Sequence, residues 1–209
     1  EINRIFEVAK KNIEIYTIFR VLHATGMRPG ELRALRWKDF NKEDKTISII
    51  SAITKEYDTK KDVLNPTKKR EIVSSTKSEY SKRTLKLSDA AVEALAKWRE
   101  HLDNYGTEEL RNSQYIFPGP DGNFIKENTY HNKIYRFSRC EELKDIGVTS
   151  YRFRHTLCTN LVLKGIPARV ILKILGDNTL DLINKVYSHI SDNDVNKSLK
   201  KLFDSKEYY

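Results

Sequence analysis

The stretch Thr46-Ile47-Ser48-Ile49-Ile50-Ser51-Ala52-Ile53 decides the fold class of this chain. It is rich in β-branched residues and alternates roughly between polar and apolar side chains, which is the pattern of a β-strand. Strand-like runs also occur at residues 71–76 and 83–87. Together these runs predict a small three-stranded antiparallel sheet.

Before and after these strand-like runs in the sequence, apolar residues recur at helical spacing. Upstream, two helices are expected to end at Gly26, and a short helix follows Pro29. Downstream, Ser88 is the expected N-cap of a helix whose apolar positions are Ala91, Leu95, Trp98 and Leu102. Further helices are expected at residues 130–137, 154–164, 167–175 and 195–203. We therefore predict a mainly α fold with a small sheet (α+β): one domain over residues 1–190 and a tail helix over 191–209.

The charge of the chain predicts a polyanionic partner. Its 209 residues carry a net charge of +9, and the sequence pI is about 9.4. Basic residues cluster in the segments that join the predicted strands: Lys55, Lys60, Lys61, Lys68, Lys69, Arg70, Lys77 and Lys82. Such a segment can be merely solvated, but we favour contact with a phosphate backbone. The residues expected to bind DNA are Lys55, Lys68, Lys69, Arg70, Lys82 and Arg83.

Cysteine usage and hydropathy predict a cytoplasmic protein. Cys140 and Cys158 match neither a metal-binding spacing nor a disulfide framework, so we expect two buried thiols in a reducing compartment. No apolar run is long enough to span a membrane, and the first residues do not form a signal peptide. Because the chain begins with Glu1, we expect it to be a fragment of a longer protein.

Arg28 and Arg154 are candidates for binding a phosphodiester. Each is expected beside a turn or a helix start, where a side chain can project into a cleft. Arginine suits this role because its planar guanidinium makes paired hydrogen bonds to the oxygens on which negative charge builds. For a single arginine taken alone, a surface salt bridge is the more common role.

Five segments of the sequence place these arginines in a larger pattern. In chain order they are 24–32 (ATGMRPGEL), 76–78 with 82–87 (TKS, KRTLKL), 151–156 (YRFRHT), 174–177 (ILGD) and 186–189 (VYSH). In this order they resemble the catalytic domain of the tyrosine recombinase, or phage integrase, family over most of the chain. The TKS hairpin followed by RTLKL favours the integrases of phages and conjugative transposons, although recombinases that resolve chromosome dimers share these features.

The resemblance implies that Tyr187 is the nucleophile. A phenol has a pKa of about 10, so it needs a nearby acceptor or an electropositive pocket before it attacks. Lys77 matches the lysine that donates a proton to the departing 5′ oxygen, and Lys82 is a rival for this role. The expected catalytic set is therefore Arg28, Lys77, Arg154 and Tyr187, with Tyr151 and Asp177 as further candidates.

Two positions depart from the family's commonest pattern. Tyr151 stands where a histidine or lysine is usual, and its hydroxyl can still donate a hydrogen bond to phosphate. Asp177 stands where histidine or tryptophan is usual, and its carboxylate either orients an arginine or accepts a proton. Asn178 is an alternative donor. For His155 and His189, which also match family residues, we expect local packing and hydrogen bonding.

The function implied by the resemblance is site-specific recombination of double-stranded DNA through a 3′-phosphotyrosyl intermediate, for integration or excision of a mobile element in a bacterium or phage. Metal ligands do not occur at a recognisable spacing, so we expect no metal and no cofactor. The resemblance also implies a tetramer on DNA, a tail that packs in cis or on a neighbouring protomer, and an upstream core-binding domain absent from this chain. A topoisomerase with the same chemistry and a catalytically impaired DNA-binding module are the alternatives.

Overall fold

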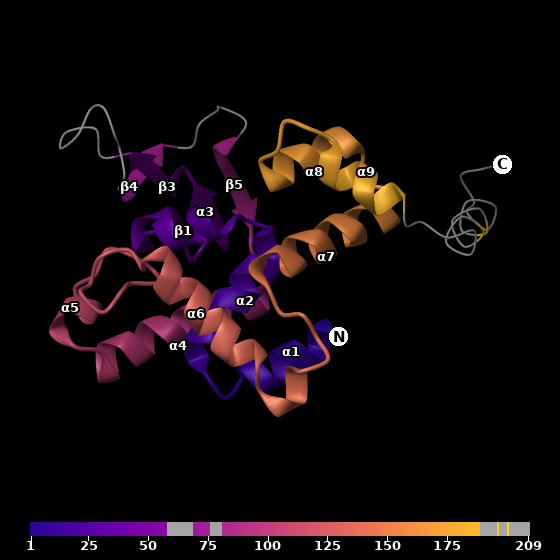
Figure 1. Cartoon of the computed structure of the whole chain (residues 1–209). Coiled ribbons are helices and arrows are strands. Elements are labelled where there is room, and N and C mark those ends of the chain that lie inside the picture. The colour runs from indigo at the N-terminus through magenta and orange to yellow at the C-terminus, as the bar shows by residue number, and fades with distance from the viewer. Residues whose placement is uncertain (58–68, 76–80, 189–195, 197–199, 201–209) are drawn as a thin grey trace.

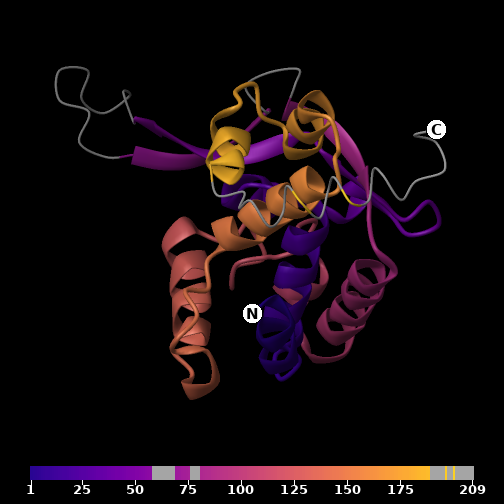
Figure 2. The same cartoon turned by 90° about the vertical axis from the view of Figure 1, so that its right-hand side faces the viewer.

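The computed structural model describes residues 1–57, 69–75, 81–188, 196 and 200. Its α-helices are α1 (Ile2–Ala9), α2 (Ile13–Thr25), α3 (Pro29–Ala34), α4 (Asp89–Tyr105), α5 (Glu108–Arg111), α6 (Glu127–Ser138), α7 (Ser150–Leu163), α8 (Ala168–Leu175) and α9 (Asp181–Tyr187). Its strands are β1 (Phe40–Asn41), β2 (Thr46–Ile49), β3 (Ser51–Tyr57), β4 (Lys69–Ser75) and β5 (Arg83–Lys86). The strands lie with α8 and α9 on one side of the molecule and α1, α2, α4 and α6 on the other, with α7 between (Figures 1 and 2).

The predicted class, mainly helical with a small antiparallel sheet, is confirmed, but the strands pair differently from the prediction. The run over residues 46–53 is divided at Ile50 into β2 and β3. In the described chain, β2 lies between β1 and β5 in one sheet, while β3 pairs with β4 in another. The strand β1 was not predicted. Periodicity shows which residues are extended, but it does not show where a strand changes its partner.

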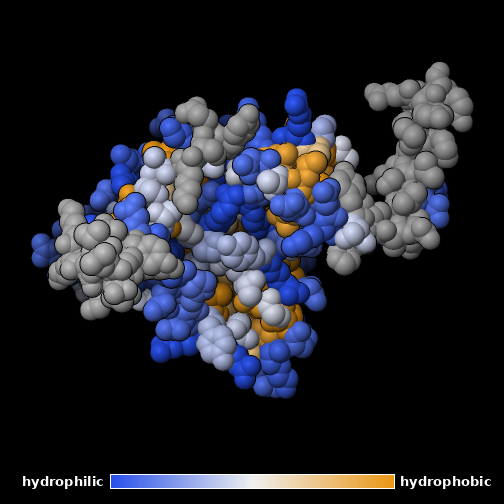
Figure 3. All heavy atoms as spheres, turned by 45° about the horizontal axis from the view of Figure 1, so that its top comes forward, coloured by the Kyte–Doolittle hydropathy of each residue, from blue (hydrophilic) through white to orange (hydrophobic). Residues whose placement is uncertain are grey.

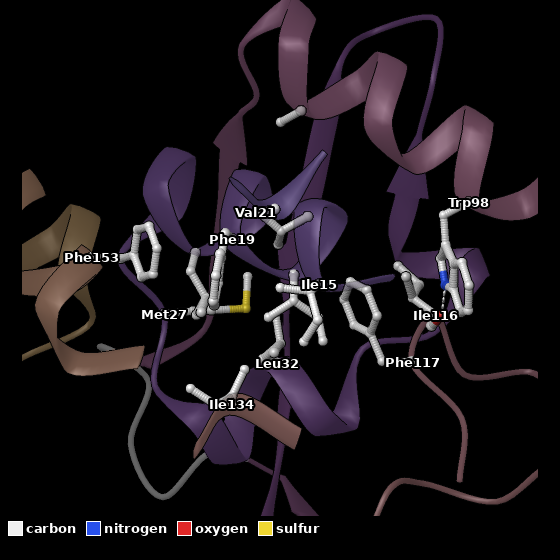
Figure 4. Close-up of a cluster of buried hydrophobic side chains, with 14 of the residues drawn as sticks. Ile15, Phe19, Val21, Met27, Leu32, Trp98, Ile116, Phe117, Ile134 and Phe153 are labelled. Carbon is white, nitrogen blue, oxygen red and sulfur yellow. Dashed lines mark hydrogen bonds between the residues drawn. The ribbon is translucent and has the colours of Figure 1, made fainter. Parts of the chain in front are cut away.

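Helix α2 runs through the centre of the helical side. Its N-terminus is capped by Asn12, whose side-chain oxygen accepts a hydrogen bond from the backbone N–H of Ile15 at 3.0 Å. Its C-terminus stops at Gly26, whose left-handed φ of 59° is suited to glycine. Figure 4 shows Phe19 of this helix beside Phe153 of α7, with ring centroids 4.7 Å apart.

Helix α4 has the buried face that its sequence predicts. Ser88 is its N-cap residue, although its side chain makes no capping hydrogen bond. The predicted apolar positions are all buried: Ala91, Leu95, Trp98 and Leu102. The indole of Trp98 donates to the carbonyl oxygen of Ile116 at 2.6 Å, so its polar atom is satisfied inside the core (Figure 4).

Helix α7 joins two clusters of buried apolar side chains. Its residue Phe153 belongs to the large cluster built on α2 and α4. The second cluster consists of Cys158, Val162, Ile171, Leu175, Ile183 and Val186, which come from α7, α8 and α9. The helix begins at Ser150, four residues before its predicted start, with Thr149 as its cap. Tyr151 and Arg154 therefore lie about one turn apart on one helix.

The remaining predictions on the fold concern thiols, membrane spans and the tail. Cys158 is fully buried as predicted, whereas Cys140 is partly exposed, and both are free thiols. Among the described residues, no helix is both long and apolar enough to cross a membrane. Of the predicted tail helix, only Asn196 and Lys200 are described, both in helical conformation, so the division into 1–190 and 191–209 stays a prediction.

Candidate active site

Arg28 is positioned by the start of α3. It is the N-cap residue of this helix, with extended backbone, and Pro29 fixes the first helical position. Its Nη1 donates to the carboxylate of Glu31 at 3.0 Å and to the carbonyl oxygen of Gly176 at 3.1 Å. The side chain is 37% exposed, so it is anchored but still partly open to solvent.

Arg154 is buried where the C-terminal ends of two helices meet. Its Nη1 donates to the carbonyl oxygen of Gly26 at 2.6 Å and to that of Leu175 at 2.9 Å. These carbonyls lie at the ends of α2 and α8, where the helix dipoles are negative and favour a cation. Burial lowers the pKa of Arg154, while the nearby Asp177 carboxylate opposes this shift. The guanidinium remains charged because its ordinary pKa is so high.

Asp177 joins the two arginines. Its Oδ1 accepts from Nη2 of Arg28, and its Oδ2 accepts from Nη2 of Arg154. The Asp177 side chain is 19% exposed, so this bridge is largely shielded from solvent. The two arginines predicted from the sequence are therefore brought together, and the residue that departs from the family pattern lies between them.

Glu31 and Arg83 form a buried ion pair beside Arg28. Nη2 of Arg83 donates to Oε2 of Glu31 at 2.9 Å, and both side chains are 3% exposed. Burial favours a raised pKa for Glu31, but hydrogen bonds and charge from Arg83 and Arg28 outweigh it, and the pKa is lowered. Glu31 also accepts from the backbone N–H of Arg28 at 2.9 Å, as in a capping box. This role of Glu31 was not predicted from the sequence, although a glutamate three residues after an N-cap position is the signal that could have indicated it.

The buried position of Arg83 corrects its predicted role in DNA binding. Its guanidinium donates to the Glu31 carboxylate and, at 3.0 Å, to the carbonyl oxygen of Ser81. It is therefore not exposed to a DNA phosphate at the surface. Gly176 makes room for it: with φ at 67°, a Cβ at this position would lie 2.4 Å from Nη1 of Arg83. We therefore assign Arg83 a structural role: it binds Glu31, which in turn contacts Arg28.

An open cleft of about 670 Å³ adjoins the arginines. Its lining includes Arg28, Tyr151, Asn178 and His131. Tyr151, in the first turn of α7, is 60% exposed, so its hydroxyl is free to meet a ligand in this cleft. His131 carried no signal in the sequence, because only the packing of α6 brings it here. Figure 3 shows hydrophilic residues over much of the visible face, with a hydrophobic group at its upper right.

The structure places the expected nucleophile in the chain but does not describe its side chain. Tyr187 is the last residue of α9. Ile183 and Val186 of this helix are buried in the second apolar cluster with residues of α7 and α8. Lys77, the expected proton donor, and His189 lie outside the described residues.

The predicted DNA-binding residues that the structure describes lie on β3 and β4 and at the start of β5. Lys55 of β3 is 49% exposed and forms an ion pair with Glu127. Arg70 of β4 and Lys82 before β5 are exposed, and Lys69 is the first residue of β4. Lys68 lies outside the described residues. The exposed members that are described therefore lie on β3, on β4 and just before β5.

Two further observations complete the site. His155 is exposed, and its Nδ1 lies 3.4 Å from the hydroxyl of Thr159, a local contact within α7. Within the described ranges, no three His, Cys, Asp or Glu side chains are grouped so that they could hold a metal ion.

A family model matches most of the chain. The model described as the phage integrase family covers residues 1–194. The chain therefore belongs to the phage integrase family, as its motifs predict.

Individual relatives agree with this assignment. The tyrosine recombinase XerC-like protein of Caldanaerobacter subterraneus is 25% identical over 197 residues, covering 91% of this chain and 49% of that protein. The ICEBs1 integrase of Bacillus subtilis is 27% identical over 191 residues, covering 90% and 48%. The chain spans about half the length of these relatives.

Solved structures share the fold. The crystal structure of XerA recombinase matches with a TM-score of 0.67 and 20% identity, covering 96% of this chain and 60% of that one. A structure of the Tn1549 transposon integrase in complex with a circular intermediate DNA matches with a TM-score of 0.69 and 17% identity, covering 96% and 63%.

Proposed function

We propose that this chain is the catalytic part of a site-specific DNA recombinase that integrates or excises a mobile element. The observation that carries the proposal is the convergence of Arg28 and Arg154 on one anion, the Asp177 carboxylate, at the edge of an open cleft. Membership of the phage integrase family supports it, as does likeness to a transposon integrase and an ICE integrase.

The proposed reaction begins when the hydroxyl oxygen of Tyr187 attacks the scissile phosphorus. A bond forms between this oxygen and phosphorus, and the bond from phosphorus to the 5′ oxygen breaks. The tyrosine proton passes to an acceptor in the site or to solvent, and Lys77 donates a proton to the departing 5′ oxygen. The products are a 3′-phosphotyrosyl link and a free 5′-hydroxyl. A 5′-hydroxyl of the partner strand then reverses the step.

The arginines stabilise the charge that builds on the non-bridging oxygens. Arg154 is fixed by two helix-end carbonyls and Arg28 by Glu31, so neither has to reorganise when the charge develops. Tyr151 adds a hydroxyl donor from the cleft. Because the phosphoester energy is kept in the covalent link, the exchange consumes no ATP and needs no cofactor.

The proposed partner is double-stranded DNA, held by the exposed basic residues near β3 and β4. The Tn1549 integrase, which shares this fold, is recorded with DNA. We further propose a tetramer on two DNA sites, in which the segment 191–209 docks on a neighbouring protomer. Deleting this segment tests the docking: loss of assembly on DNA with retained cleavage supports it, and unchanged assembly and strand exchange reject it.

A covalent-trapping experiment tests the chemistry without knowledge of the site. The protein is incubated with a library of duplexes that carry a nick beside a randomised sequence, so that a short 5′-hydroxyl fragment diffuses away after cleavage. We expect a covalent protein–DNA adduct that survives denaturation and is lost in Tyr187→Phe. Tyr135→Phe, a change at an exposed tyrosine of α6, is the matched control.

The same trapping experiment separates the alternatives. An adduct with relaxation of supercoiled DNA, and without joining of two sites, indicates a topoisomerase. Binding of DNA without any adduct indicates the catalytically impaired module, an alternative motivated by the departures from the family pattern at Tyr151 and Asp177.

A further inference from the structure

We propose that Asp177 is an internal anion that occupies the phosphate position of this site, and that a DNA phosphate binds by displacing it. This inference rests on the proposed function, because it concerns how the substrate reaches Arg28 and Arg154. It assigns Asp177 a role as a gate on substrate binding rather than as a donor to the transition state.

The hydrogen-bond pattern of the bridge is that of a bound phosphodiester. The two oxygens of Asp177 accept from different arginines, Oδ1 from Nη2 of Arg28 and Oδ2 from Nη2 of Arg154. Two non-bridging oxygens of a phosphate make the same contacts when two arginines hold it. The carboxylate and the phosphate therefore compete for the same donors.

The burial of Arg154 excludes binding of both anions side by side. Its Nη1 is occupied by the carbonyl oxygens of Gly26 and Leu175, and its Nη2 donates to Asp177. With its side chain 5% exposed, little of the guanidinium is open to an incoming ligand. A phosphate that reached it beside the carboxylate would also place two negative charges in contact.

The backbone at Asp177 allows the carboxylate to leave while the arginines stay in place. Gly176 ends α8 in the left-handed conformation, and the backbone N–H of Asp177 donates to the carbonyl oxygen of Leu172 at 3.0 Å. Rotation of the Asp177 side chain breaks its bonds to both arginines without moving α8. The carbonyls that hold Arg154 and the Glu31 carboxylate that holds Arg28 are unaffected by this rotation.

As a consequence, the site should bind a phosphate that is part of DNA in preference to a free phosphate. In the free protein the bridge neutralises Arg154, whose unpaired charge would be costly to bury. A free phosphate has to replace the carboxylate with little help from other contacts. A phosphate in a duplex is held by further contacts along the backbone, which supply the free energy of displacement.

Binding of inorganic phosphate, measured by calorimetry at constant ionic strength, tests this gate. We expect Asp177→Asn to bind phosphate at least about tenfold more tightly than the unchanged protein, because the competing charge is gone. Asp177→Glu keeps a competing carboxylate and is expected to bind phosphate weakly. Asp181→Asn is the matched control: it makes the same change of charge at an exposed residue that accepts from Thr179, at 2.9 Å, instead of from the arginines.

Three outcomes would overturn the gate. Unchanged or weaker phosphate binding by Asp177→Asn shows that Asp177 orients the arginines for the ligand. Equal tightening in Asp181→Asn shows a general effect of charge. The third outcome concerns thermal stability. Without phosphate, Asp177→Asn should melt at a lower temperature than the unchanged protein, and added phosphate should raise its melting temperature more. A lowered melting temperature that phosphate does not raise contradicts the proposal.

The phosphate measurement is independent of the chemical step. The same results are expected in a Tyr187→Phe background, where no adduct forms. Failure of covalent trapping with a confirmed gate therefore rejects the recombinase reaction alone, while trapping with no gate rejects only the role of Asp177.

Discussion

Arg83 donates from Nη2 to Oε2 of Glu31 at 2.9 Å, and both side chains are 3% exposed. This buried pair is the inner end of a row of alternating charges that continues through Arg28 and Asp177 to Arg154. Glu31 contacts Arg83 and Arg28. Asp177 contacts Arg28 and Arg154. The position of Arg28 relative to Arg154 therefore depends on both carboxylates. The geometry of the site is therefore coupled to the stability of the fold.

Replacing Glu31 with Gln is expected to destabilise the protein strongly. The change leaves Arg83 buried without its ionised partner, and breaking such a pair costs about 3–5 kcal/mol. Chemical denaturation measures the free energy of unfolding. Glu141→Gln, which removes an exposed pair with Lys144, is the control and should change stability little. A similar small loss in Glu31→Gln would show that the pair is not the support described here.

The stability of the protein is also expected to fall in acid because of Glu31. Burial opposes ionisation of Glu31, but its arginine partners lower the folded-state pKa below the ordinary 4.5. A lowered pKa contributes stability above the unfolded-state pKa, and this contribution is lost as the pH falls through the folded-state pKa. Unfolding free energies between pH 7 and pH 3 measure the loss. Glu31→Gln should show a shallower acid dependence, and an identical one would contradict this assignment.

Arg154→Lys is expected to slow adduct formation by about 10²–10³-fold. Lysine keeps the positive charge but cannot donate to two helix-end carbonyls and an anion with one planar group. Single-turnover trapping on a selected nicked duplex measures the rate. Arg152→Lys is the control, because Arg152 lies in the same helix but donates to the carbonyl oxygen of Gly147, at 2.9 Å. This variant should react at nearly the normal rate. Equal rates for both variants would remove Arg154 from the reaction.

Tyr151→Phe is expected to slow the same step by about 10- to 100-fold, the worth of one hydrogen bond from a neutral donor to a charged oxygen. The side chain is 60% exposed in the cleft, and the change removes only its hydroxyl. A loss as large as that of Arg154→Lys would mean that Tyr151 moves a proton in the reaction. No loss at all would show that its hydroxyl does not contact the phosphate.

Arg70→Ala is expected to weaken DNA binding mainly by removing a phosphate contact. Its loss should reduce the slope of log affinity against log salt by about 0.9. Fluorescence anisotropy at several salt concentrations measures this slope. Lys97→Ala, at an exposed residue of α4 that pairs with Glu93, is the control and should leave the slope unchanged. A slope unchanged in both variants would place the DNA elsewhere.

Local patterns in the sequence predicted the parts of the fold that depend on neighbouring residues. The apolar face of α4 follows from residues three and four positions apart, and it is buried as predicted. The division of the strand run at Ile50 depends on which strands arrive as partners, and no local pattern encodes it. The family motifs identified Arg28 and Arg154 because they name residues rather than contacts.

The contacts between distant residues were the part that the sequence could not supply. Arg83 was expected on the surface because it is one of many basic residues, but its partner Glu31 lies 52 positions earlier. Asp177 is separated from Arg28 by 149 positions, so its bridge between two cations had no signal in the spacing. The roles left open for Asp177 follow from the same limit, since a carboxylate's role is set by the charges around it.

Peptide mapping of the trapped adduct tests whether Tyr187 is the nucleophile. After digestion of the DNA with nuclease and of the protein with trypsin, mass spectrometry locates the nucleotide that remains attached. We expect a nucleotide on the peptide 186–197, which contains Tyr187, linked through a 3′-phosphate. A nucleotide on any other peptide, or an adduct that persists in Tyr187→Phe, would contradict it.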